Sequence, residues 1–102
     1  MKKLARQVYD LVAKIPQGKI ATYGQIAMAL KIKSPRLVGR ILHQNQDPQK
    51  VPCHRVVFAN GSLAKNYTYG GLIKQKERLL KEGIEMIGDK VILTKSNTSN
   101  FF

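Results

Sequence analysis

The sequence contains few of the residues from which disulfides and metal centres are built. Its 102 residues include one cysteine and two histidines. A single cysteine cannot close an internal disulfide, and this set is too small for a zinc cluster. We therefore expect no metal and no other cofactor. The thiol of Cys53 is expected to stay free in a reducing compartment, the cytoplasm.

Long apolar runs are also missing. No stretch approaches the roughly 18 consecutive apolar residues of a membrane span. The first six residues carry positive charges, but no apolar segment of the kind found in secretory signals follows them. The sequence thus predicts neither membrane insertion nor secretion.

Acidic residues are scarce: six Asp and Glu stand against 18 Lys and Arg, and the isoelectric point is about 10.2. Between Leu11 and Lys76 the only acid is Asp47, among eleven basic residues. A basic domain of this kind is typical of proteins that bind a polyanion, usually nucleic acid. Packing against RNA, or a merely solubilising surface, would have the same composition, so charge alone leaves the chemistry open.

Apolar spacing predicts four helices. The first runs about three turns through Leu4 to Val12. The second begins at Thr22, whose spacing to Gln25 is that of a capping box. The third begins at Ser34, an N-cap residue followed by proline. Only residues 31–33 separate the second and third helices, which predicts a helix-turn-helix.

Residues 19–21 and 56–58 are expected to be short extended segments, and residues 65–71 an irregular loop rich in Tyr and Gly. The fourth helix should end at Gly83, and residues 84–87 and 91–93 should form a hairpin. The predicted class is mainly α with small β elements: a winged-helix-like domain with a helix-turn-helix and a short C-terminal hairpin. We expect one domain over residues 1–94 and a flexible tail over 95–102.

Cys53 is the candidate nucleophile. A thiol attacks as the thiolate, which needs a nearby cation, base or helix N-terminus. His54 and Arg55 follow it directly, but neighbours in sequence need not face one another. From the residues alone, a buried structural cysteine is the more common alternative.

Five ordered motifs resemble the O6-alkylguanine-DNA alkyltransferases. They are Pro-Cys-His-Arg-Val at 52–56, Thr-Tyr-Gly-Gln-Ile-Ala at 22–27, Arg-Leu-Val-Gly at 36–39, Asn45 eight residues before the cysteine, and Gly-Gly-Leu at 70–72 with the closing residues 79–83. The likeness runs from about residue 8 to residue 83. It implies a single-turnover methylated-DNA–protein-cysteine methyltransferase, and in this reading Cys53 accepts the alkyl group.

The resemblance implies a role for each site residue. His54 would take the proton of Cys53 through a water, Glu82 would orient His54, and Asn45 would hold the cysteine loop. Tyr23 would donate a proton or hydrogen bond to the guanine. Because the target base must be flipped out of the duplex, Arg36 would fill the space that it leaves. The remaining expected contacts are Ser34, Gly39 and Arg40 with DNA, and Leu42, Val56, Tyr67, Thr68 and Tyr69 with the substrate.

Two departures from the family leave alternatives open. The compact layout resembles the alkyltransferase-like proteins, which bind alkylguanine without repairing it and commonly carry tryptophan in place of the cysteine. The 65–71 loop is longer than usual, so either Tyr67 or Tyr69 could take its aromatic role. We therefore expect a monomer that binds O6-alkylguanine duplex in the nucleoid or nucleus. It would act as a repair protein, as a sensor that recruits excision-repair proteins, or, least expected, as a generic basic module.

Overall fold

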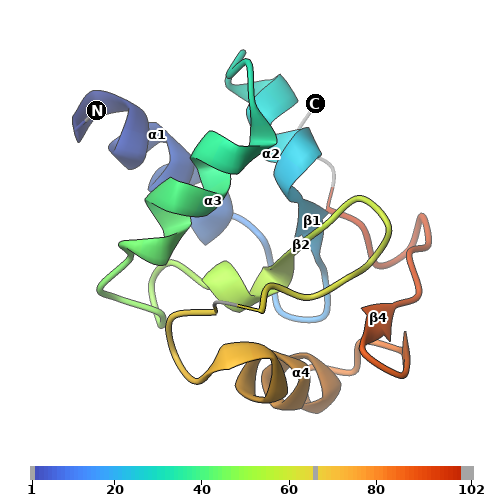
Figure 1. Ribbon diagram of the computed structural model, residues 1–102. Coiled ribbons are helices and arrows are strands. Elements are labelled where there is room, and N and C mark those ends of the chain that lie inside the picture. The colour runs from blue at the N-terminus through green and yellow to red at the C-terminus, as the bar shows by residue number, and fades with distance from the viewer. Residues whose placement is uncertain (1, 66, 100–102) are drawn as a thin grey trace.

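The computed structural model describes residues 2–65 and 67–99. They form mainly helices, with very short strands (Figure 1), and the predicted class is confirmed. The elements are α1 (Lys2–Ala13), β1 (Ala21–Thr22), α2 (Tyr23–Ala29), α3 (Pro35–His43), the 3₁₀ helix η1 (Cys53–Arg55), β2 (Val56–Val57), α4 (Gly71–Lys81), β3 (Met86–Ile87) and β4 (Lys90–Val91).

The two central helices begin where their capping residues predict. The Thr22 hydroxyl oxygen accepts a hydrogen bond from the backbone N–H of Gln25 at 3.1 Å, and the Gln25 side chain accepts one from the backbone N–H of Thr22 at 2.9 Å. The Ser34 hydroxyl caps α3 by accepting from the N–H of Arg36 at 3.2 Å. These caps satisfy N–H groups that a helix start leaves without partners. The helix-turn-helix is formed by α2 and α3.

The main core lies between α1, α2 and α3. Val8, Ile26 and Val38 from the three helices are fully buried there, together with Ala21 and Val56 from the strands. Figure 1 shows this group of helices on one side of β1 and β2, and α4 on the other. The strands therefore lie between the helix-turn-helix and the C-terminal part of the chain.

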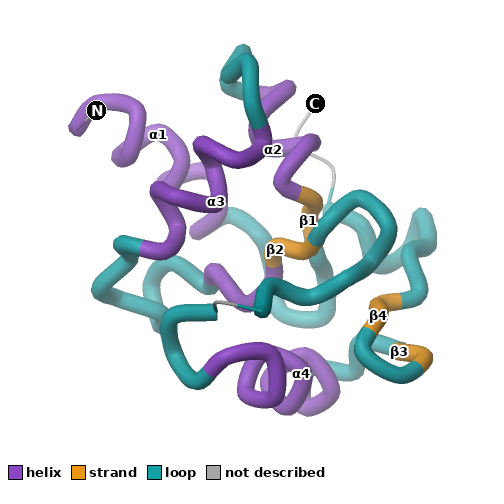
Figure 2. Tube along the Cα trace, in the orientation of Figure 1, coloured by secondary structure: helices purple, strands orange, loops and turns teal. Residues whose placement is uncertain are grey.

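The strands β1 and β2 pair in parallel, with Ala21 opposite Val56 and Thr22 opposite Val57. Figure 2 shows them meeting near the centre of the molecule. The sequence predicted both extended segments but not their pairing. The pairing matters for function because Tyr23 follows β1 directly and η1 precedes β2 directly. It thus brings the start of α2 to the cysteine-bearing segment.

The C-terminal part has its own small core under α4, and its buried residues are Ile20, Val57, Leu63, Leu79, Ile84 and Val91. The predicted hairpin is present and shorter than expected: β3 and β4 are antiparallel, with Met86 opposite Val91. Gly61 lies against β4 at φ +88°, where an added Cβ would be 2.3 Å from the carbonyl oxygen of Val91. The turn at Gly61, which precedes the 65–71 loop, is therefore packed tightly on the hairpin.

Part of the segment expected to be a flexible tail pairs with the chain near β1. The N–H of Ile20 donates to the carbonyl of Asn97 at 2.7 Å, and the N–H of Ser99 donates to the carbonyl of Ile20 at 2.7 Å. Residues 100–102 of that segment lie outside the described residues. Among the helices described, none has the length and apolar character needed to cross a membrane.

Candidate active site at Cys53

Cys53 begins η1 and is buried, with 6% of its surface exposed. Asn45 follows the C-terminal end of α3 and is also buried. Its side-chain amide lies 2.8 Å from the Val51 carbonyl, to which it donates, and 3.4 Å from the Cys53 sulfur. The structure therefore brings Asn45 to the cysteine loop and links that loop to the helix-turn-helix.

A carboxylate at the end of α4 holds the residues that follow the cysteine. Glu82 lies 2.9 Å from Nε2 of His54. It also accepts two hydrogen bonds from Arg55, each at 2.8 Å, in the bidentate arrangement that suits a guanidinium group. A third nitrogen of Arg55 donates to the Ile15 carbonyl at 2.7 Å. The structure thus brings Glu82 to His54, the residue directly after Cys53, and Arg55 is a partner of Glu82 that the sequence did not predict.

Gln75 is a second residue that the sequence analysis missed. It is fully buried on α4, and its amide nitrogen donates to the carbonyls of His54 and Val56, both at 3.1 Å. Its side-chain oxygen accepts from the N–H of Ala64 at 2.9 Å. Gln75 therefore fixes η1 and the start of β2 on α4. The sequence held one sign of this role: Gln75 lies four positions before the core residue Leu79, on the same face of the helix.

The charge states of the site follow from burial and partners. Burial raises the pKa of the Cys53 thiol, while Asn45 and the positive charge of Arg78 oppose that rise. Burial lowers the pKa of His54. Burial alone would raise the pKa of Glu82, but hydrogen bonds from Arg55 and His54 bring it below its ordinary value. The resting site therefore has a thiol, a neutral imidazole and a carboxylate.

The tautomer of His54 follows from this arrangement. An ionised carboxylate only accepts hydrogen bonds, so Nε2 carries the proton and donates to Glu82. Nδ1 is buried and has no hydrogen-bond partner among the described residues. Its lone pair is thus free to accept a proton. A histidine oriented by a carboxylate on one nitrogen, with the other nitrogen not hydrogen-bonded, is the arrangement of a general base.

A groove of about 1240 Å³ runs from α3 to the loop after β2, and Cys53 is among its lining residues. Of the residues predicted for DNA or substrate, those that line the groove are Tyr23, Ser34, Arg36, Gly39, Arg40, Leu42, Tyr67 and Thr68. Val56 and Tyr69 do not line it, and Val56 is fully buried. The groove therefore joins the cysteine to the exposed start of the second helix of the helix-turn-helix.

The long loop places its two tyrosines differently. Tyr67 is buried and lines the groove, whereas the hydroxyl of Tyr69 donates to the backbone carbonyl of Asn45. Between them, the Thr68 hydroxyl donates to the carbonyl of His43 at 2.8 Å. The rings of Tyr67 and Tyr69 meet edge to face, with centroids 6.0 Å apart. Tyr67 thus faces the groove, and Tyr69 ties the loop to the segment that holds Cys53.

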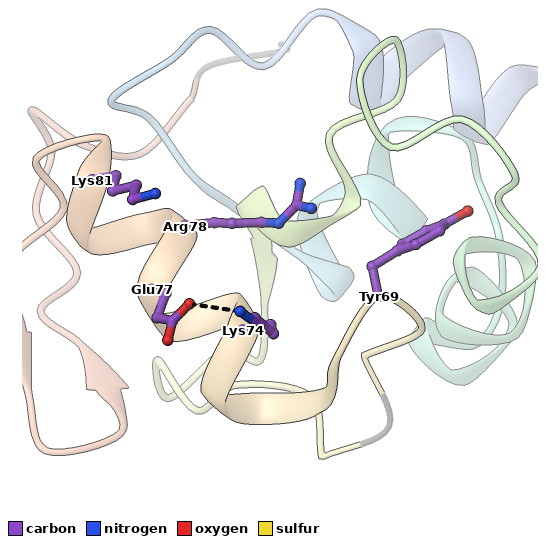
Figure 3. Close-up of a pocket in the computed structure, with 5 residues that line it drawn as sticks. All are labelled: Tyr69, Lys74, Glu77, Arg78 and Lys81. Atoms are coloured by element: carbon purple, nitrogen blue, oxygen red, sulfur yellow. Dashed lines mark hydrogen bonds and ion pairs between the residues drawn. The ribbon is translucent and has the colours of Figure 1, made fainter.

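Tyr69 also lines a smaller cavity of about 440 Å³ beside α4, together with Lys74, Glu77, Arg78 and Lys81. Figure 3 shows Arg78 extending from the helix with its guanidinium group directed away from the Lys74–Glu77 pair. Its charge opposes the rise in the pKa of Cys53 and adds to the fall in the pKa of His54. This cavity is separate from the groove and contains none of the residues predicted to act on the substrate except Tyr69.

Replacing Tyr69 with phenylalanine is expected to lower the free energy of unfolding by about 1 kcal/mol, because the Asn45 carbonyl loses its donor. Urea denaturation measures this change. Tyr67→Phe is the matched control: its hydroxyl is buried without a partner among the described residues, so its removal should cost nothing. Equal losses in the two variants would contradict the tethering role of Tyr69.

The fold and the site together define a helix-turn-helix domain with a buried cysteine facing its groove. A family model described as "6-O-methylguanine DNA methyltransferase, DNA binding domain" matches residues 3–84. The chain belongs to this family, which confirms the resemblance of its motifs.

The chain is similar to relatives of three kinds. The chain is 38% identical over 87 residues to alkyltransferase-like protein 1 of Schizosaccharomyces pombe, covering 84% of this chain and 81% of that protein. It is 44% identical over 88 residues to a methylated-DNA–protein-cysteine methyltransferase of Methanocaldococcus jannaschii, covering 86% of this chain and 50% of that protein. A bifunctional methyltransferase/endonuclease of Picrophilus torridus is 35% identical over 95 residues, or 92% of this chain, which spans only 31% of that relative.

The fold is similar to that of a crystal structure of S. pombe Atl1 in complex with damaged DNA containing O6-carboxymethylguanine. The TM-score is 0.83 at 31% identity, and the likeness covers 98% of this chain and 97% of that one.

Proposed function

We propose that the chain binds duplex DNA containing O6-alkylguanine and transfers the alkyl group irreversibly to Cys53. The observation that carries this proposal is a free thiol lining the groove, followed by a histidine whose Nε2 is held by Glu82 and whose buried Nδ1 has no hydrogen-bond partner among the described residues. A cysteine with only a structural role would need neither a place on the groove nor a histidine oriented by a carboxylate. The names of the methyltransferase relatives support the same activity.

In the proposed reaction the sulfur of Cys53 attacks the alkyl carbon, and the bond from that carbon to guanine O6 breaks as the carbon–sulfur bond forms. The thiol proton passes to Nδ1 of His54, through a water where the two do not touch. Tyr23 donates to the guanine that leaves. Burial raises the pKa of Tyr23 to about 12, which keeps its hydroxyl protonated as a donor. The guanine anion then takes up one proton, and His54 gives up the proton that it received, both through solvent. The net result is a thioether on Cys53, a neutral His54 and a guanine restored to its ordinary form.

The DNA would lie along the start of α3, where Ser34, Arg36 and Arg40 are exposed and line the groove. Arg36 would enter the duplex, while Arg40 and Ser34 would contact phosphates. Gly39 would let the backbone approach closely, since an added Cβ there finds only Tyr23, at 3.9 Å. The flipped base would then reach Cys53 from the open side of the groove.

The alkyl pocket would be formed by Leu42, Tyr67 and Thr68, which line the groove with Cys53. The carbonyl of Val56 already accepts a hydrogen bond from Gln75, so its use by the guanine amine would occupy the second lone pair of that oxygen. Tyr69 would not touch the substrate and would act only by holding the 65–71 loop in place through its hydrogen bond to Asn45.

A damage sensor is the second candidate, and the likeness to S. pombe Atl1 over nearly the whole of both chains favours it. In that role the same groove would hold the alkylguanine without transfer, and excision-repair proteins would be recruited to the complex. In either role we propose a monomer. A free acceptor thiol suits a reducing compartment, the cytoplasm or nucleus.

Mass spectrometry of the intact protein separates these functions. After mixing with O6-methylguanine duplex, the protein is expected to gain the mass of one methyl group, and Cys53→Ser is expected to gain nothing. Tight binding of the damaged duplex without a mass change would leave only the sensor. Equal affinity for damaged and undamaged duplex would leave a generic basic module.

A further inference from the structure

Phe58 is a large aromatic residue with 46% of its surface exposed. It follows β2 directly and is held by the turn behind it. Its N–H donates to the Ser62 carbonyl at 2.9 Å, and its own carbonyl accepts from the N–H of Gly61 at 2.8 Å. The Gly61 carbonyl in turn accepts from the N–H of Val91 in β4 at 2.8 Å. The exposed ring is therefore presented by a backbone fixed to the hairpin.

The ring of Phe58 lines the groove beside Tyr23. The two ring centroids are 5.0 Å apart at an interplanar angle of 49°. This contact covers only part of the ring, and other lining residues of the groove include Arg36, Arg40 and Lys65. The other strongly exposed large apolar residues described, including Met28, Ile73 and Ile87, are not among the lining residues. Phe58 is thus an exposed aromatic surface inside a cationic groove.

A nucleobase is the ligand that fits this combination. Phosphates pair with the arginine and lysine side chains, and the aromatic face of a base stacks on an aromatic ring. In an intact duplex both faces of each base are already covered by its neighbours. When a nucleotide leaves the stack, faces of that base and of its neighbours become available.

We propose that Phe58 is a stacking platform that packs against a base of the duplex beside the flipped lesion, and not against the lesion itself, and that it thereby contributes preference for damaged over intact duplex. This inference rests on the proposed function, because it requires DNA in the groove. It adds a contact that does not depend on charge. Its effect on affinity should therefore be insensitive to salt, unlike that of the phosphate contacts.

A competing explanation is that Phe58 only supports Tyr23. Phe58→Leu separates the two, because leucine keeps apolar bulk against Tyr23 but offers no aromatic face. Phe58→Tyr restores the face. If the residue only supports Tyr23, Phe58→Leu should slow the reaction of Cys53 with free O6-benzylguanine, which involves no duplex.

Binding is measured in a Cys53→Ser background by fluorescence anisotropy, with matched O6-methylguanine and undamaged duplexes over a range of salt. Phe58→Leu is expected to weaken binding of the damaged duplex about 5- to 100-fold and of the undamaged duplex less than about twofold. The slope of log affinity against log salt should not change. Phe58→Tyr should bind within about twofold of the parent. Lys65→Met is the matched control, expected to weaken both duplexes and reduce the slope by about one.

Unchanged binding in Phe58→Leu, an equal loss on both duplexes, or a slower reaction with the free base would each overturn the platform. A parent protein that binds the two duplexes equally would overturn the proposed function as well, and this is seen before any Phe58 variant is made. A parent that prefers the damaged duplex, with Phe58→Leu unaffected, would overturn this inference alone.

Discussion

Replacing Glu82 with alanine is expected to lower the free energy of unfolding by about 3 kcal/mol. The Glu82 side chain is 12% exposed and that of Arg55 is 16% exposed. Removing the carboxylate leaves a largely buried guanidinium without a counter-charge and takes the acceptor from Nε2 of His54. The alkyl transfer should fail as well, because the imidazole is no longer oriented. Urea denaturation at pH 7 measures the first effect and the methyl mass gain the second.

Glu77→Ala is the matched control for this prediction. Glu77 is on α4, which ends just before Glu82, and pairs with Lys74 at 3.3 Å, but both side chains are more than half exposed. An exposed pair of this kind contributes about 0.5 kcal/mol or less. If the two alanine variants lose the same stability, the pairing of Glu82 with Arg55 and His54 is not what holds η1 on α4.

The same network sets a pH dependence whose sign can be worked out. Glu82 has a lowered pKa in the folded protein, so its contribution is present above the unfolded value of about 4.5 and is lost as the pH falls through the lower folded value. His54 also has a lowered pKa, so the unfolded chain binds its proton first and stability declines as the pH falls below about 6.5. Both groups make acidification destabilising. In Glu82→Gln the part of the stability loss that occurs below about pH 4.5 should be absent, because glutamine does not titrate.

The helix starts could be predicted because their signals are local. Thr22 and Gln25 satisfy each other's N–H groups, the Ser34 hydroxyl accepts from the N–H of Arg36, and Pro35 has no N–H that needs a partner. These contacts lie within one turn, so no distant residue is needed. The parallel pairing of β1 with β2 could not be predicted in this way. Each strand has two residues and their partners are far apart in sequence, so no period or turn marks the pairing. That contact nevertheless decides where Tyr23 lies relative to Cys53.

The candidate site was predicted in part, through the resemblance of its motifs. Its buried polar supports were not. Arg55 and Gln75 belong to residue types that are usually exposed. Only the fold shows that Gln75 is fully buried, that Arg55 is largely buried, and that hydrogen bonds hold both side chains. The roles of Tyr67 and Tyr69 could not be separated either, since an irregular loop has no periodicity to tell which ring faces inward. The hydrogen bond from Tyr69 to Asn45 makes that distinction.

Replacing Arg36 with alanine is expected to slow transfer from O6-methylguanine duplex by on the order of 30-fold or more, while the reaction with free O6-benzylguanine changes less than about twofold. Arg36 is exposed at the start of α3 and lines the groove with Cys53. Filling the space left by a flipped base matters only when there is a duplex. Single-turnover rates on the two substrates measure the difference.

Two neighbouring changes test the reason for that difference. Arg36→Lys keeps the charge but loses the planar group that stacks, so it should restore little of the duplex rate. Arg40→Ala removes a cation one turn further along the exposed face of the same helix, and as a phosphate contact it should weaken damaged and undamaged duplex alike. If Arg36→Ala instead slows the duplex and the free base equally, Arg36 acts on the cysteine site itself and not on the base stack. If Arg36→Lys is fully active, only the charge is needed.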